Sequence, residues 1–172
     1  MRISAKAEYA VRAAVELAAT ADDSRAAQKG EAGSRAGGKR EGEKPVKAEQ
    51  IATAQEIPLN FLENILGDLR HAGIVRSHRG AEGGFRLAKA AEEITVADVI
   101  RAVDGPLASV RGGPPEDTSY GGSAEALGRV WIAVRANLRR VLEQVTIADV
   151  ATGQLPEPVE RLAEDPEAWL TR

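Results

Sequence analysis

The segment from Pro58 to Leu87 limits the possible folds more than any other part of this sequence. Four apolar side chains recur at the spacing of one helical face: Leu62, Ile65, Leu66 and Leu69. They predict a helix over residues 58–71, with Pro58 at its first position and Gly73 just beyond its end. Short runs at 74–77 and 85–87, separated by a glycine-containing tip at 79–84, then predict a β-hairpin.

The residues before this segment predict further helices. Ser4 is suited to cap a helix over 5–19, and residues 47–55 predict a short helix around Ile51 and Ala52. Two helices joined by a tight turn, with a small residue near their crossing, are typical of a helix-turn-helix. A hairpin directly after the second helix is the wing of a winged helix. The expected fold is therefore mainly α with a small β-hairpin wing, and residues 1–90 form the winged helix-turn-helix domain.

One stretch inside this domain lacks the composition of a folded element. Residues 21–45 contain no large apolar side chain, so they bury too little surface to offset the entropy of ordering. We expect a disordered insertion. A passive loop and an arm that touches DNA are both open interpretations, since six basic residues nearly balance five acidic ones.

The second half of the chain predicts a dimerisation region over 91–152. Thr95 begins a helix that runs to Asp104, and a loop rich in Gly and Pro follows over 105–123. Apolar residues then alternate at spacings of four and three, which indicates a helix packed lengthwise on another helix. These are Leu127, Trp131, Val134, Leu138, Val141 and Val145. A long helix buried within one subunit is the alternative, but a chain with 3% aromatic residues has a thin core, which favours a homodimer. Residues 153–172 are an acidic tail without an assigned role.

Charge is distributed unevenly along the chain. The net charge is −3, yet residues 1–90 hold 15 Lys or Arg against 12 Asp or Glu, and residues 70–89 carry a net +4. A local basic patch is what phosphate binding requires. An ordinary solvated face is the competing interpretation of the charge alone.

The predicted fold assigns roles to three groups of candidate DNA contacts. The start of the second helix of a helix-turn-helix reaches base edges in the major groove, and the wing meets phosphates and the minor groove. The candidates on that helix are Asn60, Phe61, Glu63 and Asn64, with Arg70 near its end. Those in the wing are Arg76, His78, Arg79, Gly80, Gly83, Gly84 and Arg86, and those at the first helix are Ser4 and Lys6. Phe61 is also explained by packing, Glu63 by an exposed surface position, and the glycines by an ordinary hairpin loop.

Several function classes are disfavoured. The chain has no cysteine, and His71 and His78 lack further soft ligands nearby, so we expect no metal and no cofactor. Ser77 and His78 point to opposite faces of a strand, so they cannot act together as a nucleophile and its base. We therefore do not expect the protein to be an enzyme. Neither a membrane span nor a signal peptide is indicated, so we expect a cytoplasmic protein. A winged-helix adaptor that contacts proteins rather than DNA is the main alternative function.

Short motifs of this chain resemble the Rrf2 family of bacterial winged-helix regulators. They are Ile51-Ala52, Ile57-Pro58, Leu62-Glu63, Ile65-Leu66, Ala72-Gly73, Arg79-Gly80 and Gly83-Gly84-Phe85-Arg86-Leu87. The segments Ile3-Ser4-Ala5-Lys6 and Ile94-Thr95-Val96-Ala97-Asp98-Val99 also resemble the family. The resemblance implies a homodimer that binds a partly palindromic operator of double-stranded DNA.

The same resemblance shows one departure from the family's pattern. Cluster-binding members carry three cysteines in the loop before the long helix, and the corresponding loop here, 105–123, has none. Because thiolates hold iron–sulfur clusters, a sensor of that kind is excluded. The chain is more similar to a cysteine-free branch that includes a repressor of sulfur and cysteine metabolism. That branch implies sensing through a small-molecule effector or a partner enzyme, and the regulon is an expectation by analogy.

Overall fold

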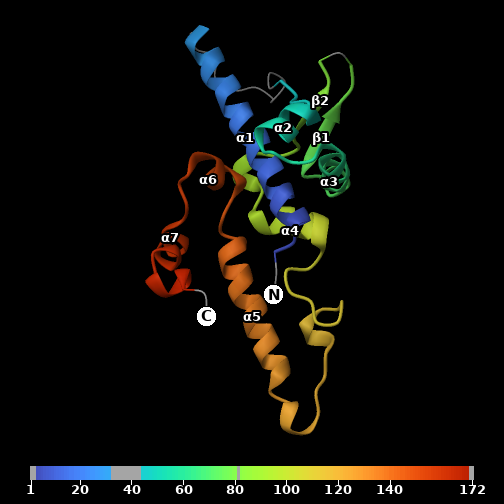
Figure 1. Cartoon of the computed structure of the whole chain (residues 1–172). Helices are drawn as coiled ribbons and strands as arrows, with labels where there is room; N and C mark the ends of the chain where they lie inside the picture. The colour runs from blue at the N-terminus through green and yellow to red at the C-terminus, as the bar shows by residue number, and fades with distance from the viewer. Residues whose placement is uncertain (1–2, 32–43, 81, 171–172) are drawn as a thin grey trace.

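The computed structural model describes residues 3–31, 44–80 and 82–170 of the 172-residue chain. It is mainly helical with one antiparallel hairpin, which confirms the predicted fold class (Figure 1). The helices are α1 (Ala5–Glu31), α2 (Ala48–Ala54), α3 (Leu59–His71), α4 (Val96–Asp104), α5 (Leu127–Leu142), α6 (Ile147–Thr152) and α7 (Glu157–Ala163). The strands are β1 (Val75–His78) and β2 (Gly84–Leu87), and short 3-10 turns lie at Ala91–Glu93, Pro115–Asp117, Gly122–Ala124 and Pro166–Trp169. In the described ranges, no helix is both long and apolar enough to cross a membrane.

The core forms where α1 packs against α3, α4 and α6. The buried face of α1 consists mostly of alanines, which let the neighbouring helices approach closely. Its buried residues are Ala7, Ala10, Ala13, Ala14, Leu17 and Ala18. The four apolar residues predicted to face inward from α3 are all fully buried against it, so that prediction is confirmed.

The helix-turn-helix and its wing follow the predicted order. The backbone leaves α3 at Gly73, whose φ of 71° suits a glycine after a helix end, and Ile74 N–H bonds to the Leu69 carbonyl at 2.9 Å. In the hairpin, Val75 lies opposite Leu87 and His78 opposite Gly84. Val46 adds a bridge to Phe85 through two backbone hydrogen bonds of 2.7 and 2.8 Å, so the wing is attached to the chain before α2.

Helix α1 is longer than predicted. It continues to Glu31, past the expected end at residue 19 and into the segment expected to be disordered. Residues 20–31 are mostly alanine and polar residues with fair helix propensity, and extending an existing helix requires no new nucleation. The absence of large apolar residues therefore did not end the helix. Residues 32–43 of the predicted insertion lie outside the described residues.

Helices α4 and α6 begin in the same way and side by side. Thr95 and Asp98 form a reciprocal capping box at α4, as predicted, and Thr146 and Asp149 repeat it at α6. The two caps are joined by backbone hydrogen bonds, from Val96 to the Val145 carbonyl at 2.9 Å and from Ile147 to the Ile94 carbonyl at 2.8 Å. The paired caps hold α6 against the winged-helix domain.

Helix α5 projects away from that domain, together with the loop that precedes it (Figure 1). None of its described residues is fully buried. Leu127, Trp131, Val134, Leu138 and Val141 are half-buried and share one side of the helix, as their spacing predicted. Val145 was wrongly assigned to this seam. It follows the end of α5 and is buried in its own subunit, because the chain turns at Glu143 to reach the α6 cap.

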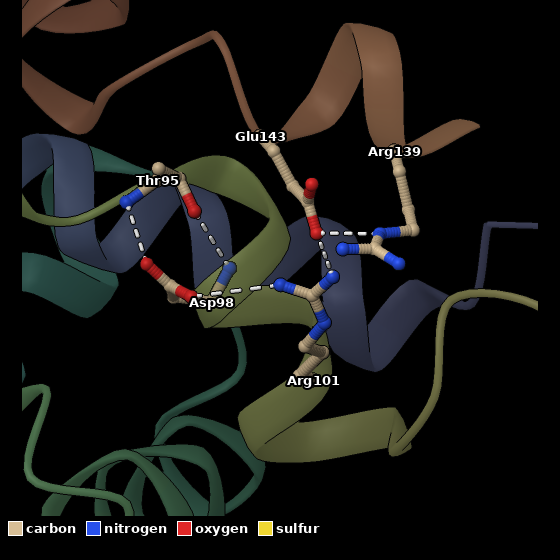
Figure 2. A network of polar contacts seen from close by, with 5 residues as sticks. All are labelled: Thr95, Asp98, Arg101, Arg139 and Glu143. Carbon is tan, nitrogen blue, oxygen red and sulfur yellow. Dashed lines mark hydrogen bonds and ion pairs between the residues drawn. The ribbon is translucent and has the colours of Figure 1, made fainter. Parts of the chain in front are cut away.

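A cluster of charged side chains joins α5 to α4 (Figure 2). Glu143 accepts hydrogen bonds from Arg101 of α4 and from Arg139, the latter at 2.9 Å, and Arg101 also lies 3.6 Å from Asp98. The hydrogen bonds from Arg101 and then Arg139 hold the pKa of Glu143 below its usual value. The charged form of Glu143 is thus the one that binds α5 to α4.

We expect Glu143→Gln to lower the urea midpoint at neutral pH and to leave it nearly unchanged in acid. A carboxylate with a lowered pKa in the folded state stabilises the fold above its unfolded pKa, and this contribution is lost as pH falls through the folded pKa. Urea unfolding from neutral pH down through the ordinary range of glutamate checks this. A difference between the two proteins that persists unchanged at the lowest pH would show that Glu143 acts through packing instead.

Candidate DNA-binding surface

Helix α3 has one face in the core and the other open. Asn60, Glu63 and Asn64 are exposed, and Phe61 is 41% exposed. These residues occupy the first two turns, the part of a recognition helix that reaches base edges. Arg70 is exposed in the last turn. The predicted contacts of α3 are therefore available to a partner.

Two of these side chains also have contacts within the chain. The Phe61 ring packs edge-on against Tyr9 of α1, with centroids 5.8 Å apart, so both interpretations of Phe61 describe part of its surface. Asn64 donates its side-chain amide to the Asn60 carbonyl at 3.0 Å. That bond is local and weak, and Asn64 can exchange it for a base edge by rotating its side chain.

Sequence reasoning missed the residue that holds the helix-turn-helix turn. Arg12 of α1 reaches Gln55, donating to its backbone carbonyl and to its side-chain oxygen, and Gln55 in turn donates to Glu16 at 2.7 Å. Glu56, next in the turn, has a positive φ of 51°. The spacing of Glu8, Arg12 and Glu16 indicated charge pairs along a helix. The partner Gln55, 43 positions away from Arg12, gave no such signal.

The wing carries basic side chains on a two-stranded hairpin. Arg76 and Arg86 lie directly opposite each other in the hairpin, and Arg79 is exposed at the tip. Two arginines at opposite positions of the ladder give the hairpin a local positive surface, which suits an anionic partner. His78 is half-buried at the end of β1. Gly80 follows Arg79 with a φ of 108°, a conformation that favours glycine.

The remaining wing glycines are required by close approach of the backbone. A Cβ atom at Gly83 would lie 2.6 Å from the His78 carbonyl oxygen, and one at Gly84 would lie 2.5 Å from the Val46 carbonyl oxygen. Gly84 is therefore the point where the hairpin crosses the chain that leads to α2. These two glycines shape the wing, and their part in DNA binding stays a prediction.

We expect Gly84→Ala to lower the free energy of unfolding by about 1–3 kcal/mol, because the new methyl group displaces the Val46 backbone. Gly67→Ala is the matched control. A Cβ at Gly67 meets nothing within 4 Å, so this variant should gain about 0.5–1 kcal/mol from helix propensity. Urea unfolding of both variants measures the two effects. Equal stability of Gly84→Ala and the parent would contradict the close approach.

Ser4 and Lys6, which were predicted as phosphate contacts, are partly exposed and have partners within the chain. Ser4 caps α1 and donates its hydroxyl to Asp104 at 2.5 Å. The Lys6 ammonium lies 2.7 Å from Asp68 of α3 and donates to the Val103 carbonyl at 3.2 Å. Their polar groups are used inside the chain because the start of α1 lies between α3 and the end of α4. Their phosphate contacts stay a prediction, in which a phosphate would compete with these internal partners.

Comparisons with known proteins agree with this architecture. The family model for Rrf2, described as an iron-dependent transcriptional regulator, matches residues 38–153. Rv1287 of Mycobacterium tuberculosis, whose name places it among HTH-type transcriptional regulators, is 49% identical over 96% of this chain and 90% of its own length. CymR of Bacillus subtilis, the global cysteine regulator, is 30% identical over 88% of this chain and 91% of its own length.

Solved structures show the same fold. The structure of B. subtilis CymR superposes with a TM-score of 0.66 at 28% identity, covering 89% of this chain and 98% of that one. The structure of T. potens IscR superposes with a TM-score of 0.61 at 26% identity, covering 100% and 93%.

The residues of this chain do not fit an iron–sulfur cluster. No cysteine is present in the sequence, and the described ranges contain no group of three or more histidine and carboxylate side chains placed to hold a metal. Cluster irons are held by thiolates, with histidine as a partial substitute in some proteins. The iron in the family's description therefore does not carry over to the ligands available here.

The chain has a helix-turn-helix with an exposed face on α3, a basic wing and a projecting helix α5. The family model matches more than half of the sequence, and relatives named as transcriptional regulators match nearly all of it. This chain belongs to the Rrf2 family and is a DNA-binding transcription regulator.

Proposed function

We propose that this protein is a homodimeric repressor that binds a partly palindromic operator, holds no iron–sulfur cluster, and controls genes of sulfur or cysteine metabolism. The proposed set of regulated genes is supported by the similarity of this chain, along nearly its whole length, to CymR, the global cysteine regulator. The absence of cysteine supports sensing by a small-molecule effector or a partner enzyme. No catalytic role is part of the proposal.

In this proposal α3 enters the major groove. Asn60 and Asn64 pair with adenine edges, Glu63 accepts from a cytosine amino group, and Phe61 presses on a thymine methyl. Arg79 enters the minor groove beside the half-site, where a narrow A·T-rich groove attracts arginine. The other wing and helix-end residues, Arg70, Arg76, His78 and Arg86, meet phosphates and fix the register.

Helix α5 supports the homodimer. It is amphipathic, its seam is half-buried in a single chain, and none of its described residues reaches full burial. A helix with an apolar stripe gains stability when that stripe packs against another element. A second α5 supplies such an element through Leu127, Trp131, Val134, Leu138 and Val141.

We expect Asn64→Ala to change base preference at one position of each half-site, with little loss of affinity for unrelated DNA. A bidentate contact from asparagine discriminates its adenine by about 1–3 kcal/mol, and the sequence-independent phosphate contacts remain. Binding to a set of single-base operator variants at fixed salt measures this. A uniform loss across all variants would contradict base reading by Asn64.

The repressor proposal is tested by anisotropy measurements with DNA taken from upstream of the gene and of nearby sulfur genes. We expect specific binding that weakens steeply as salt rises, because phosphate contacts release counterions. Adding candidate cysteine precursors to the same measurement tests the small-molecule effector. Binding to protein partners alone, with no salt-dependent DNA binding, would favour the adaptor alternative.

A further inference from the structure

The C-terminal segment of the chain is ordered and yet uncovered. Asp165 caps the 3-10 turn Pro166–Trp169 through the Glu167 N–H at 2.9 Å, and the Trp169 indole donates to the Ala163 carbonyl at 2.6 Å. These bonds tie the turn to the end of α7. The apolar side chains of this unit are exposed all the same: Leu162 by 57%, Trp169 by 77% and Leu170 by 61%. A tryptophan and two leucines gathered on a short segment mark a surface that binds another protein surface.

The segment is also acidic. Residues 153–170 contain five carboxylates and one basic residue, Arg161. The carboxylates are Glu157, Glu160, Glu164, Asp165 and Glu167. Arg161 lies 3.7 Å from Glu157 and offsets one of them. A complementary surface therefore combines apolar area with a surplus of positive charge.

The outer side of α5 has this combination. Leu127–Leu142 contains four arginines and no acidic residue. With 3.6 residues per turn, Ile132 and Ala136 lie on the side of the helix away from the half-buried seam, with Arg129 and Arg140 beside them. Ile132 is 44% exposed. We name this the outer face of α5: Arg129, Ile132, Ala136 and Arg140.

We propose that residues 153–170 of one copy dock on the outer face of α5 in a second copy of the chain. Leu162, Trp169 and Leu170 cover Ile132 and Ala136, and the carboxylates face Arg129 and Arg140. The inference rests on the homodimer proposed above, whose seam leaves the outer face of α5 free. In a symmetric dimer the contact forms twice.

The position of the tail favours the second copy over its own α5. Within a single chain both surfaces are exposed, so the tail does not cover the outer face of its own subunit. In Figure 1, α7 lies toward the C-terminal end of α5 and away from its N-terminal end, whereas Arg129 and Ile132 belong to the N-terminal half. Antiparallel pairing of two α5 helices brings the partner's N-terminal half to the end where α7 lies.

Disulfide trapping tests this directly, because the full chain contains no native cysteine. Ile132→Cys in one chain is mixed with Leu162→Cys in a second chain that carries a size tag, and the mixture is oxidised mildly. The control pairs Leu162→Cys with Ser77→Cys, since Ser77 is exposed on β1 of the wing, away from α5 and α7 (Figure 1). We expect the mixed disulfide of the test pair to exceed that of the control several-fold, and Arg129→Glu with Arg140→Glu to remove the excess. Sedimentation of the parent chain reports the dimer separately.

Each outcome of these experiments supports or contradicts the docking. An excess of the mixed disulfide that the arginine changes abolish supports the docking. A dimeric parent with no excess over the control overturns the docking and leaves the dimer in place. A chain carrying both cysteines, diluted into parent protein, closes a disulfide within itself if the tail covers its own α5, and that result overturns the second-copy assignment. A monomeric parent overturns the dimer and the docking together.

Discussion

Replacing Arg79 with alanine is expected to weaken operator binding about 10- to 100-fold at moderate salt. At the lower end of the usual range an arginine that contacts DNA contributes about 1 kcal/mol, and the loss of two of them in a dimer corresponds to roughly 30-fold. Since Arg79 is exposed at the wing tip and followed by Gly80 with a positive φ, the side chain is free to enter a groove without rearranging the hairpin. The preference for A·T pairs beside each half-site should relax as well, because a narrow minor groove no longer gains an arginine.

Fluorescence anisotropy with operators that differ in the flanking base pairs measures both effects. Arg161→Ala serves as the control, since it removes an equal charge from α7, away from the wing, where Arg161 pairs with Glu157. The two variants have the same net charge, so a difference between them reports position rather than charge. Unchanged operator affinity in Arg79→Ala at fixed salt would show that the wing does not enter the groove.

The second large effect concerns the proposed seam of α5. Val134→Asp places a carboxylate on the half-buried side of the helix. In the proposed dimer each copy contributes one such carboxylate to the interface. Burying an unpaired charge costs several kcal/mol, so the dimer dissociation constant should rise roughly 100-fold or more. Operator binding should fall with it, because a monomer meets one half-site at a time.

Sedimentation over a range of protein concentrations measures the dissociation constant, and circular dichroism checks that the fold persists. Gln144→Glu adds the same charge at an exposed position just past the end of α5 and should leave the dimer intact. A Val134→Asp protein that still sediments as a dimer at the parent's concentrations would place the interface on another surface.

Local patterns were enough to predict the winged helix. The apolar spacing of α3, the glycine at its end and the short runs of the hairpin each depend on neighbours within a few residues, and all three were confirmed. The seam of α5 was predicted for the same reason up to Val141. The assignment of Val145 was wrong because the heptad pattern continues past Glu143, the residue at which the chain turns. The Thr146 cap marks the start of α6, but no local signal marks the end of α5.

Contacts between distant residues could not be predicted in this way. Ser4 and Lys6 were predicted as phosphate contacts because a helix N-terminus with a lysine is typical of an anion site, and their partners within the chain were not foreseen. Their actual partners, Asp104 and Asp68, lie 100 and 62 positions along the chain and become neighbours only when α3 and α4 pack around α1. Arg12 and Gln55 are a second pair of this kind. Both cases involve polar side chains whose partners are decided by helix packing.

Lys6 links the recognition helix α3 to α4. Its ammonium group contacts Asp68 of the recognition helix and the Val103 carbonyl near the end of α4, the helix that leads into the loop before α5. A displacement of α4 is therefore expected to tilt α3 in each subunit. In the proposed dimer, two recognition helices meet major grooves about 34 Å apart, so a small tilt changes their separation relative to the helical pitch of the operator. If the proposed effector moves that loop, we expect it to release DNA by changing this separation, while the side chains proposed to contact bases stay unchanged.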